Sequence, residues 1–132
     1  MSEGAAAEGA RVLREEAAAL AALGARMEES DLAVDFAEAV RMLSAATGRI
    51  VVTGMGKSGH IGAKMAATFA STGSPSLFLH PGEASHGDLG MIGAGDVVLA
   101  LSHTGGTSEL SDLLAYCDDQ GIPLIAITSR VD

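Results

Sequence analysis

Hydrophobic residues recur at helical spacing in the first third of the chain, and the pattern then changes to short continuous runs. Residues 5–28 are rich in Ala with interspersed Arg and Glu, a composition that favours a helix with only a weak apolar stripe. Residues 31–47 carry a sharper stripe, with Ser30 as a candidate cap and Gly48 as a stop signal. We therefore predict two successive helices, the first of which needs a packing partner.

The rest of the chain alternates short apolar runs with segments of helical spacing. One helix is predicted after Gly54 and a second around Leu110, while the polar stretch from His80 to Gly90 predicts a loop. The runs are apolar at successive positions, which is typical of parallel strands covered on both faces in a doubly wound α/β sheet. The predicted strands are residues 50–54, 76–79, 97–101 and 123–128.

The last predicted strand lies close to the end of the sequence. Residues 124–127 are typical of a strand that is buried on both sides, yet too few residues follow for a helix that would cover it. Either a partner chain covers this strand or the natural polypeptide continues, and we favour continuation.

Charge and cysteine content exclude several classes of protein. The net charge is −9, and neither the first 48 residues nor the remainder is basic, which argues against a binder of duplex nucleic acid. Cys117 is the single cysteine, so this chain cannot build a disulfide framework or a cysteine zinc knuckle. The charge-free run 17–25 is about half the ~18 residues that a membrane helix needs, and nearby Glu residues are unlike a secretion signal. We expect a soluble protein of the reducing cytoplasm with no membrane partner.

A glycine-rich turn, GMGKSGHIG at residues 54–62, follows the first predicted strand. It satisfies G-x-G-x-x-G, but the second strand ends FLH without the acid that a dinucleotide ribose would need. A Walker loop is excluded because Val51 stands where that motif requires Gly. We interpret the turn as a site for a small phosphate ester, with Ser58 as hydroxyl donor and Lys57 as a fixed positive charge.

A second turn, SHTGGTSE at residues 102–109, follows the third predicted strand. Four hydroxyls, two glycines and the start of a helix are typical of a phosphate cradle built from hydroxyl and amide donors. Alternatively, Thr107 is simply a helix cap and Glu109 a first-turn acid that complements the helix dipole. From these residues alone the two interpretations stay open.

Two histidines and two acids lie within the polar stretch HPGEASHGD, residues 80–88. Such a cluster can bind a metal, but the stretch lacks H-E-x-x-H, and histidines in a loop over a ligand pocket commonly donate hydrogen bonds or shuttle protons. We therefore predict no metal site. Cys117, on the apolar face of its predicted helix, is interpreted as a buried small hydrophobic residue.

Two long stretches carry a family resemblance: GMGKSGHIGAKMAATFASTG at residues 54–73 and HPGEASHGDLGMI at residues 80–92. Here the chain resembles the sugar isomerase (SIS) domain family, most closely the arabinose 5-phosphate isomerases that open the route to the lipopolysaccharide sugar Kdo. The resemblance implies a three-layer αβα sandwich of flavodoxin-like type, with an N-terminal helical segment (1–48) and a SIS core (49–132). The family sheet has five strands, so the last strand and helix are expected to be missing from this sequence.

The resemblance also implies an activity: interconversion of ribulose 5-phosphate and arabinose 5-phosphate through a cis-enediol, without a metal or other cofactor. It implies a phosphorylated sugar as ligand and a homo-oligomer as the assembly. Carried over residue by residue, the phosphate-binding positions are Ser58, Ser102, Thr104 and Thr107, the surrounding loop positions are Gly56, Gly59, His103 and Gly105, and the catalytic positions are Lys57, His86 and Glu109.

These catalytic positions carry side chains suited to such a reaction. A carboxylate such as Glu109 can move a proton between C1 and C2, which is typically worth ~10² to 10⁴ in rate. Lys57 would stabilise the negative oxygen of the enediolate. His86 would shuttle protons between the two oxygens or hold the sugar hydroxyls.

The chain departs from the family pattern in the second turn. Where the family more often has Asn, Ser and Glu, this chain has His103, Thr104 and Gly106, so one hydroxyl is kept and one carboxylate is lost. The family also draws a glutamate and a histidine of its active site from sequence after the fourth strand, and many members add a tandem CBS pair. We therefore keep a non-catalytic sugar-phosphate-binding module, or an inactive fragment, as the alternative. A dinucleotide-binding domain rests on G-x-G-x-x-G alone.

Overall fold

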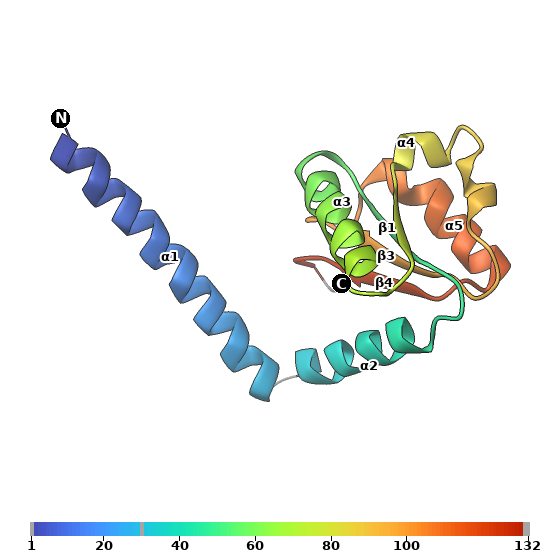
Figure 1. Ribbon diagram of the computed structural model, residues 1–132, viewed down its shortest axis with the longest axis horizontal. Coiled ribbons are helices and arrows are strands. Elements are labelled where there is room, and N and C mark those ends of the chain that lie inside the picture. The colour runs from blue at the N-terminus through green and yellow to red at the C-terminus, as the bar shows by residue number, and fades with distance from the viewer. Residues whose placement is uncertain (1, 30, 131–132) are drawn as a thin grey trace. The chain divides into compact units, whose positions relative to one another are not determined.

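The computed structural model describes residues 2–29 and 31–130, and the chain divides into two compact units, Met1–Val40 and Arg41–Asp132 (Figure 1). Helix α1 (Ser2–Glu29) and helix α2 (Asp31–Ala45) confirm the two predicted helices, and the candidate cap Ser30 lies outside the described residues. None of residues 4–28 and 31–40 is buried. In the described part of the chain, no helix combines the length and apolar character needed to span a membrane.

The surface of α1 is that of a solvated helix. Arg11 pairs with Glu8 and with Glu15, at the spacings of one helical turn. Apolar side chains are also exposed along it, and Leu13 and Leu20 have exposed fractions of 67% and 70%. The first unit therefore buries no core among its described side chains.

The second unit is built on a sheet of four parallel strands in the order β2-β1-β3-β4. The four strands predicted from the apolar runs are confirmed, and only the last is shorter than predicted, by one residue at each end. Their bounds are β1 (Ile50–Gly54), β2 (Ser76–Leu79), β3 (Val97–Leu101) and β4 (Leu124–Ile127).

Helices cover both faces of this sheet (Figure 1). Helix α3 (Gly56–Ser71) packs on the face that carries Ile50 and Val52, and helix α5 (Ser111–Gln120) on the face that carries Val51. Successive residues of one strand thus enter opposite cores, which explains why the strand is apolar at every position. The three-layer α/β fold class is confirmed.

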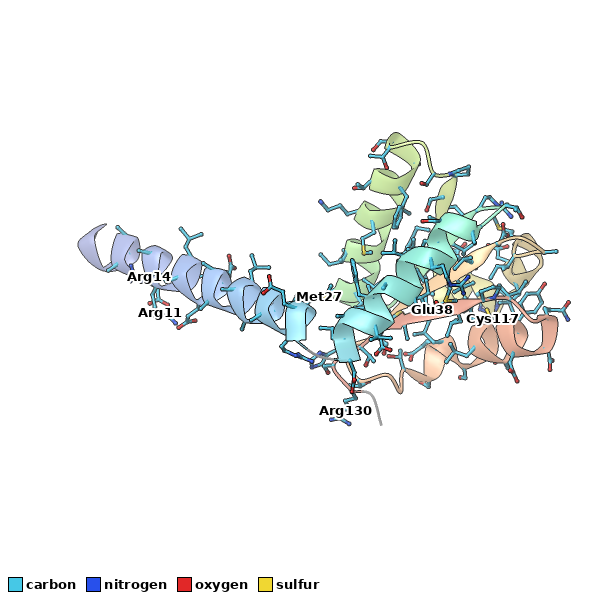
Figure 2. All side chains as sticks on the ribbon, turned by 90° about the horizontal axis from the view of Figure 1, so that it is seen from below. Arg11, Arg14, Met27, Glu38, Cys117 and Arg130 are labelled. Carbon is cyan, nitrogen blue, oxygen red and sulfur yellow. The ribbon has the colours of Figure 1, made fainter. Side chains whose placement is uncertain are left out.

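Cys117, labelled in Figure 2, lies on α5 and is 2% exposed in the core on that face. Burial raises the pKa of its thiol. The predicted role as a buried apolar residue is confirmed.

The predicted loop from His80 to Gly90 is wrong in part, because the segment contains helix α4 (Pro81–Ala84) and the 3-10 helix η1 (Asp88–Met91). The Gly82 amide donates to Nδ1 of His80 at 3.1 Å, so His80 caps the helix that Pro81 begins. A side-chain acceptor before a proline at the first helical position is a standard helix start. The polar composition of the stretch predicts a loop, whereas the His80–Pro81 pair is the sequence signal for this short helix.

Strand β4 differs from the expectation of a strand buried on both sides. Leu124 and Ile125 are half-buried, whereas Ala126 is exposed and Ile127 is 50% exposed. The reason is its position at the edge of the sheet, where β3 is its one neighbour among the described strands.

A buried carboxylate joins the amino ends of β1 and β3. Asp96, whose side chain is 5% exposed, accepts hydrogen bonds from the Arg49 amide at 2.6 Å and the Gly93 amide at 3.0 Å, and its Oδ2 lies 3.2 Å from the Arg49 guanidinium. A Cβ on Gly48 would lie 2.3 Å from Oδ1, so the close approach requires glycine there. Burial alone would raise the pKa of Asp96, but the two amides and the guanidinium together hold it below its ordinary value.

We expect Asp96→Asn to cost about 2 kcal/mol of unfolding free energy at neutral pH, because a charged acceptor is lost from three donors. The folded pKa is depressed, so the stabilisation is complete above about pH 4, the unfolded pKa, and is lost as pH falls through the folded pKa. Urea denaturation at several pH values checks both points. A difference in unfolding free energy between the unaltered protein and Asp96→Asn that does not become smaller in acid would contradict this role.

Glycines allow α3 to approach β1 closely, and this packing is also testable. A Cβ on Gly59 would lie 2.6 Å from the Gly54 carbonyl oxygen, a backbone atom that cannot move aside cheaply. We expect Gly59→Ala to cost roughly 2 kcal/mol or more in denaturation experiments. Gly90→Ala, where nothing lies within 4 Å, is the control. Equal stability of the two variants would exclude this packing role.

Candidate functional site

Three loops leave the sheet at the same edge, after the carboxyl ends of β1, β2 and β3. Gly54 pairs with Leu101, and Thr53 pairs with Leu79, so the loops begin side by side. The chain winds outward from β1 to β2 and from β3 to β4, and the direction reverses between β1 and β3. Open α/β sheets bind ligands at this reversal, outside the carboxyl ends of the strands.

The first turn joins β1 to the start of α3. Gly56 has φ +58°, and a Cβ on Gly54 would lie 3.1 Å from both the Leu101 oxygen and the backbone of Ser58. The glycines therefore turn the chain and seat the helix start against two strands. No side chain of the described residues caps this helix and its first turn holds no acid, so its amino end, beside the exposed Lys57, favours an anion.

The second turn joins β3 to the 3-10 helix η2 (Ser108–Leu110) and α5. The Ser102 and Thr107 hydroxyl oxygens lie 2.7 Å apart, and Ser102 is 9% exposed. Thr107 occupies the cap position of η2, as the alternative interpretation predicts, but its side chain makes no capping hydrogen bond there. Its hydroxyl is directed to Ser102 instead.

The tip of the second turn is attached to the segment after β4. The Ser129 amide donates to the His103 carbonyl at 3.2 Å, and the Ser129 hydroxyl donates to the same oxygen. Gly105 has φ +72°, the left-handed conformation that reverses the chain there. Thr104 is exposed at this tip.

Glu109 stands in the first turn of η2, where an acid complements the helix end. Its own backbone amide and then the Ser108 hydroxyl, which donates at 2.9 Å, hold the pKa of the exposed carboxyl below its ordinary value. The side chain is therefore ionised at neutral pH, in the form that accepts a proton.

The third loop, α4 with η1, borders an open surface hollow of about 400 Å³. Helix α4 contacts both η2 and α5, so the third loop packs beside the end of the second turn. Among the residues that the structure describes, no three His, Cys, Asp or Glu side chains are grouped as a metal site. The hollow is lined by His80, Gly82, Glu83, His86 and Asp88.

The predicted site residues are thus distributed over three neighbouring loops. Ser102 contacts Thr107 through their hydroxyls, and its carbonyl accepts a hydrogen bond from the Gly105 amide. His86 lies on the third loop, at the hollow. The first turn holds Gly56, Lys57, Ser58 and Gly59, and the second turn and η2 hold His103, Thr104, Gly105 and Glu109.

Thr53, the last side chain of β1 before the glycine turn, is not among the residues that the sequence predicts for the site. It is fully buried, and its hydroxyl has no hydrogen-bond partner among the described residues. The available signal was a hydroxyl that follows two valines in a buried strand. The sequence places His80, Glu83 and Asp88 in a predicted loop, and only the folding of that stretch into α4 and η1 brings them to one hollow.

Comparison with known proteins places the chain in a family. The SIS domain model matches residues 42–132. An arabinose 5-phosphate isomerase KdsD from Pseudomonas aeruginosa is 58% identical over 96 residues, which are 73% of this chain and 29% of that protein. The KdsD enzyme of Escherichia coli K12 is 61% identical over 83 residues, 63% of this chain and 25% of that protein.

A solved structure agrees with this assignment. The protein c3406 of E. coli CFT073, in complex with A5P, superposes with a TM-score of 0.71 at 45% identity, covering 74% of this chain and 52% of that one. The chain spans between a quarter and a third of the length of the two curated relatives named above. Since the family model covers well over half of the sequence, the chain belongs to the SIS domain family.

Proposed function

We propose that this chain supplies the sugar-phosphate site of an aldose-ketose isomerase that interconverts D-ribulose 5-phosphate and D-arabinose 5-phosphate through a cis-enediol. The observation that carries the proposal is the pairing of Gly54 with Leu101, which starts two glycine- and hydroxyl-rich turns side by side at the reversal of the sheet. Similarity to KdsD enzymes and to a structure in complex with A5P supports the choice of sugar.

The phosphate of the sugar binds between the two turns. The amino end of α3 and Ser58 supply donors from one side, and the hydroxyls of Ser102 and Thr107 supply donors from the other. The net charge of −9 does not prevent this, because charges beyond ~8 Å are largely screened at physiological salt while these donors touch the ligand. Thr104, His103 and the turn glycines shape the rim.

The isomerisation needs a proton carried between C1 and C2. The Glu109 carboxylate removes the proton from one carbon, which leaves the anion of the cis-enediol, and returns that proton to the other carbon. A bound sugar that excludes water from this exposed carboxylate raises its pKa toward the range in which a base works well at neutral pH. Lys57 stabilises the negative enediolate oxygen, and His86 moves the proton between the two sugar oxygens.

A binding module without turnover is the second candidate. It is favoured by the lowered pKa of Glu109, which makes the free carboxylate a weaker base than an ordinary glutamate. We also propose that the protein acts as a homo-oligomer in the cytoplasm, supported by the exposed apolar side chains of α1 and by the single free cysteine.

Ligand binding is tested by titrating arabinose 5-phosphate into the chain and following amide NMR signals. We expect shifts concentrated at residues 55–59 and 102–107, and a dissociation constant roughly 10-fold higher or more for Ser102→Ala, because a hydrogen bond to a charged group is lost. Ser71→Ala, at the far end of α3, is the control and is expected to bind normally. Shifts that avoid both turns would refute the phosphate site.

Turnover is tested by NMR detection of ribulose 5-phosphate formed from arabinose 5-phosphate. Lys57→Ala and Glu109→Ala are expected to lower kcat by about 10² or more while the fold remains intact, because both side chains are exposed. Lys64→Ala, an exposed lysine of the same helix, is the matched control. Normal turnover in both site variants would remove their assigned roles, and binding without any product in the unaltered chain would establish the module instead.

A further inference from the structure

The carboxyl end of the third loop is held by two side chains from elsewhere in the second unit. The Tyr116 hydroxyl, on α5, donates to the Ile92 carbonyl at 3.0 Å. The Arg49 guanidinium donates to the neighbouring Met91 carbonyl and also pairs with Asp96. Two successive carbonyls at the end of η1 are therefore attached to α5 and to the start of β1.

The other end of this loop is attached by burial. Pro81 and Ala84 of α4 are buried, and Ala84 belongs to the core beneath α5. Between the two attachments the chain is exposed at Ser85, His86 and Gly87. The position of His86 therefore depends on how firmly both ends are held.

The attachment through Tyr116 can be removed without losing the packing of its side chain. Its ring packs against the same core as Leu89 of η1, so a phenylalanine would keep the apolar contact and lose only the hydroxyl. The hydroxyl acts on a backbone carbonyl of the loop, while the helix that carries it begins directly after η2 and Glu109. One hydrogen bond thus connects the element behind the second turn to the loop of His86.

We propose that Tyr116 is a positioning residue: by holding the Ile92 carbonyl, its hydroxyl sets the placement of the segment that carries His86 over the hollow. The inference rests on the proposed function for the part played by His86 in turnover. Tyr116 itself contacts the loop and need not contact the sugar.

The first test is hydrogen exchange in the unliganded chain, which requires no activity. Loss of one hydrogen bond in Tyr116→Phe is expected to speed exchange at the Gly90 and Ile92 amides about fivefold relative to the Val52 amide in β1. Cys117→Ala is the matched control, because it disturbs the adjacent residue of the same helix and core without touching a loop carbonyl. Cys117→Ala is expected to speed exchange at the Gly90 and Ile92 amides no more than at the Val52 amide.

The second test is turnover of arabinose 5-phosphate. Tyr116→Phe is expected to lower kcat about fivefold with KM unchanged, because the phosphate is held by the other two turns. In a His86→Ala background the Tyr116→Phe change is expected to have no further effect, since both act through one loop.

Three results would overturn the proposal. The first is that Tyr116→Phe speeds exchange at Gly90 and Ile92 no more than at Val52, and the second is that Cys117→Ala speeds exchange at these loop amides as much as Tyr116→Phe does. The third is that Tyr116→Phe lowers kcat in the His86→Ala background as much as in the unaltered protein. Absence of any turnover by the unaltered chain would refute the isomerase function and, with it, the expected effect of Tyr116 on kcat through His86. The exchange result would still decide whether Tyr116 holds the loop.

Discussion

Parallel pairing of β1 with β3 is the constraint on which the rest of the second unit depends. At the amino ends the two strands are joined through Asp96, which accepts a hydrogen bond from the Arg49 amide and pairs with the Arg49 guanidinium. The same guanidinium donates to the Met91 carbonyl at the end of η1. At the carboxyl ends the same pairing sets Gly54 beside Leu101 and so aligns the two turns. One register therefore determines both the stability of the strand starts and the geometry of the candidate site.

Small residues allow close packing in the first turn and at the start of α3. Gly59 must be small because the Gly54 carbonyl oxygen lies 2.6 Å from its Cβ position, and a Cβ on Gly62, 3.1 Å from the Phe78 ring, would require that ring to shift by a few tenths of an ångström. This close seating directs the uncapped amino end of α3 to the edge of the sheet. Close packing of α3 against β1 thus accounts for Gly54 and Gly59 of the G-x-G-x-x-G pattern.

Local electrostatics oppose the net charge in this fold. The chain carries −9, yet the reversal point gathers Lys57, a helix amino end and a pair of hydroxyls. Glu109 is held ionised by its own amide and by Ser108. Under the proposed function, the amino end of α3 and the hydroxyl pair hold the anion while Ser108 holds Glu109, so the two negative charges use different donors.

The sequence by itself determined the strands, the two N-terminal helices and the turns after β1 and β3, because burial on both faces makes a strand apolar at every position and glycines mark sharp turns. It also determined the family, through long matching stretches. Only the tertiary structure decided that Thr107 bonds to Ser102, that His80 caps a helix, and that Tyr116 holds the Ile92 carbonyl. The bond from Tyr116 joins groups from separate elements, and the short-range partners of Thr107 and His80 depend on how the loops pack, whereas hydrophobic periodicity reports on burial alone.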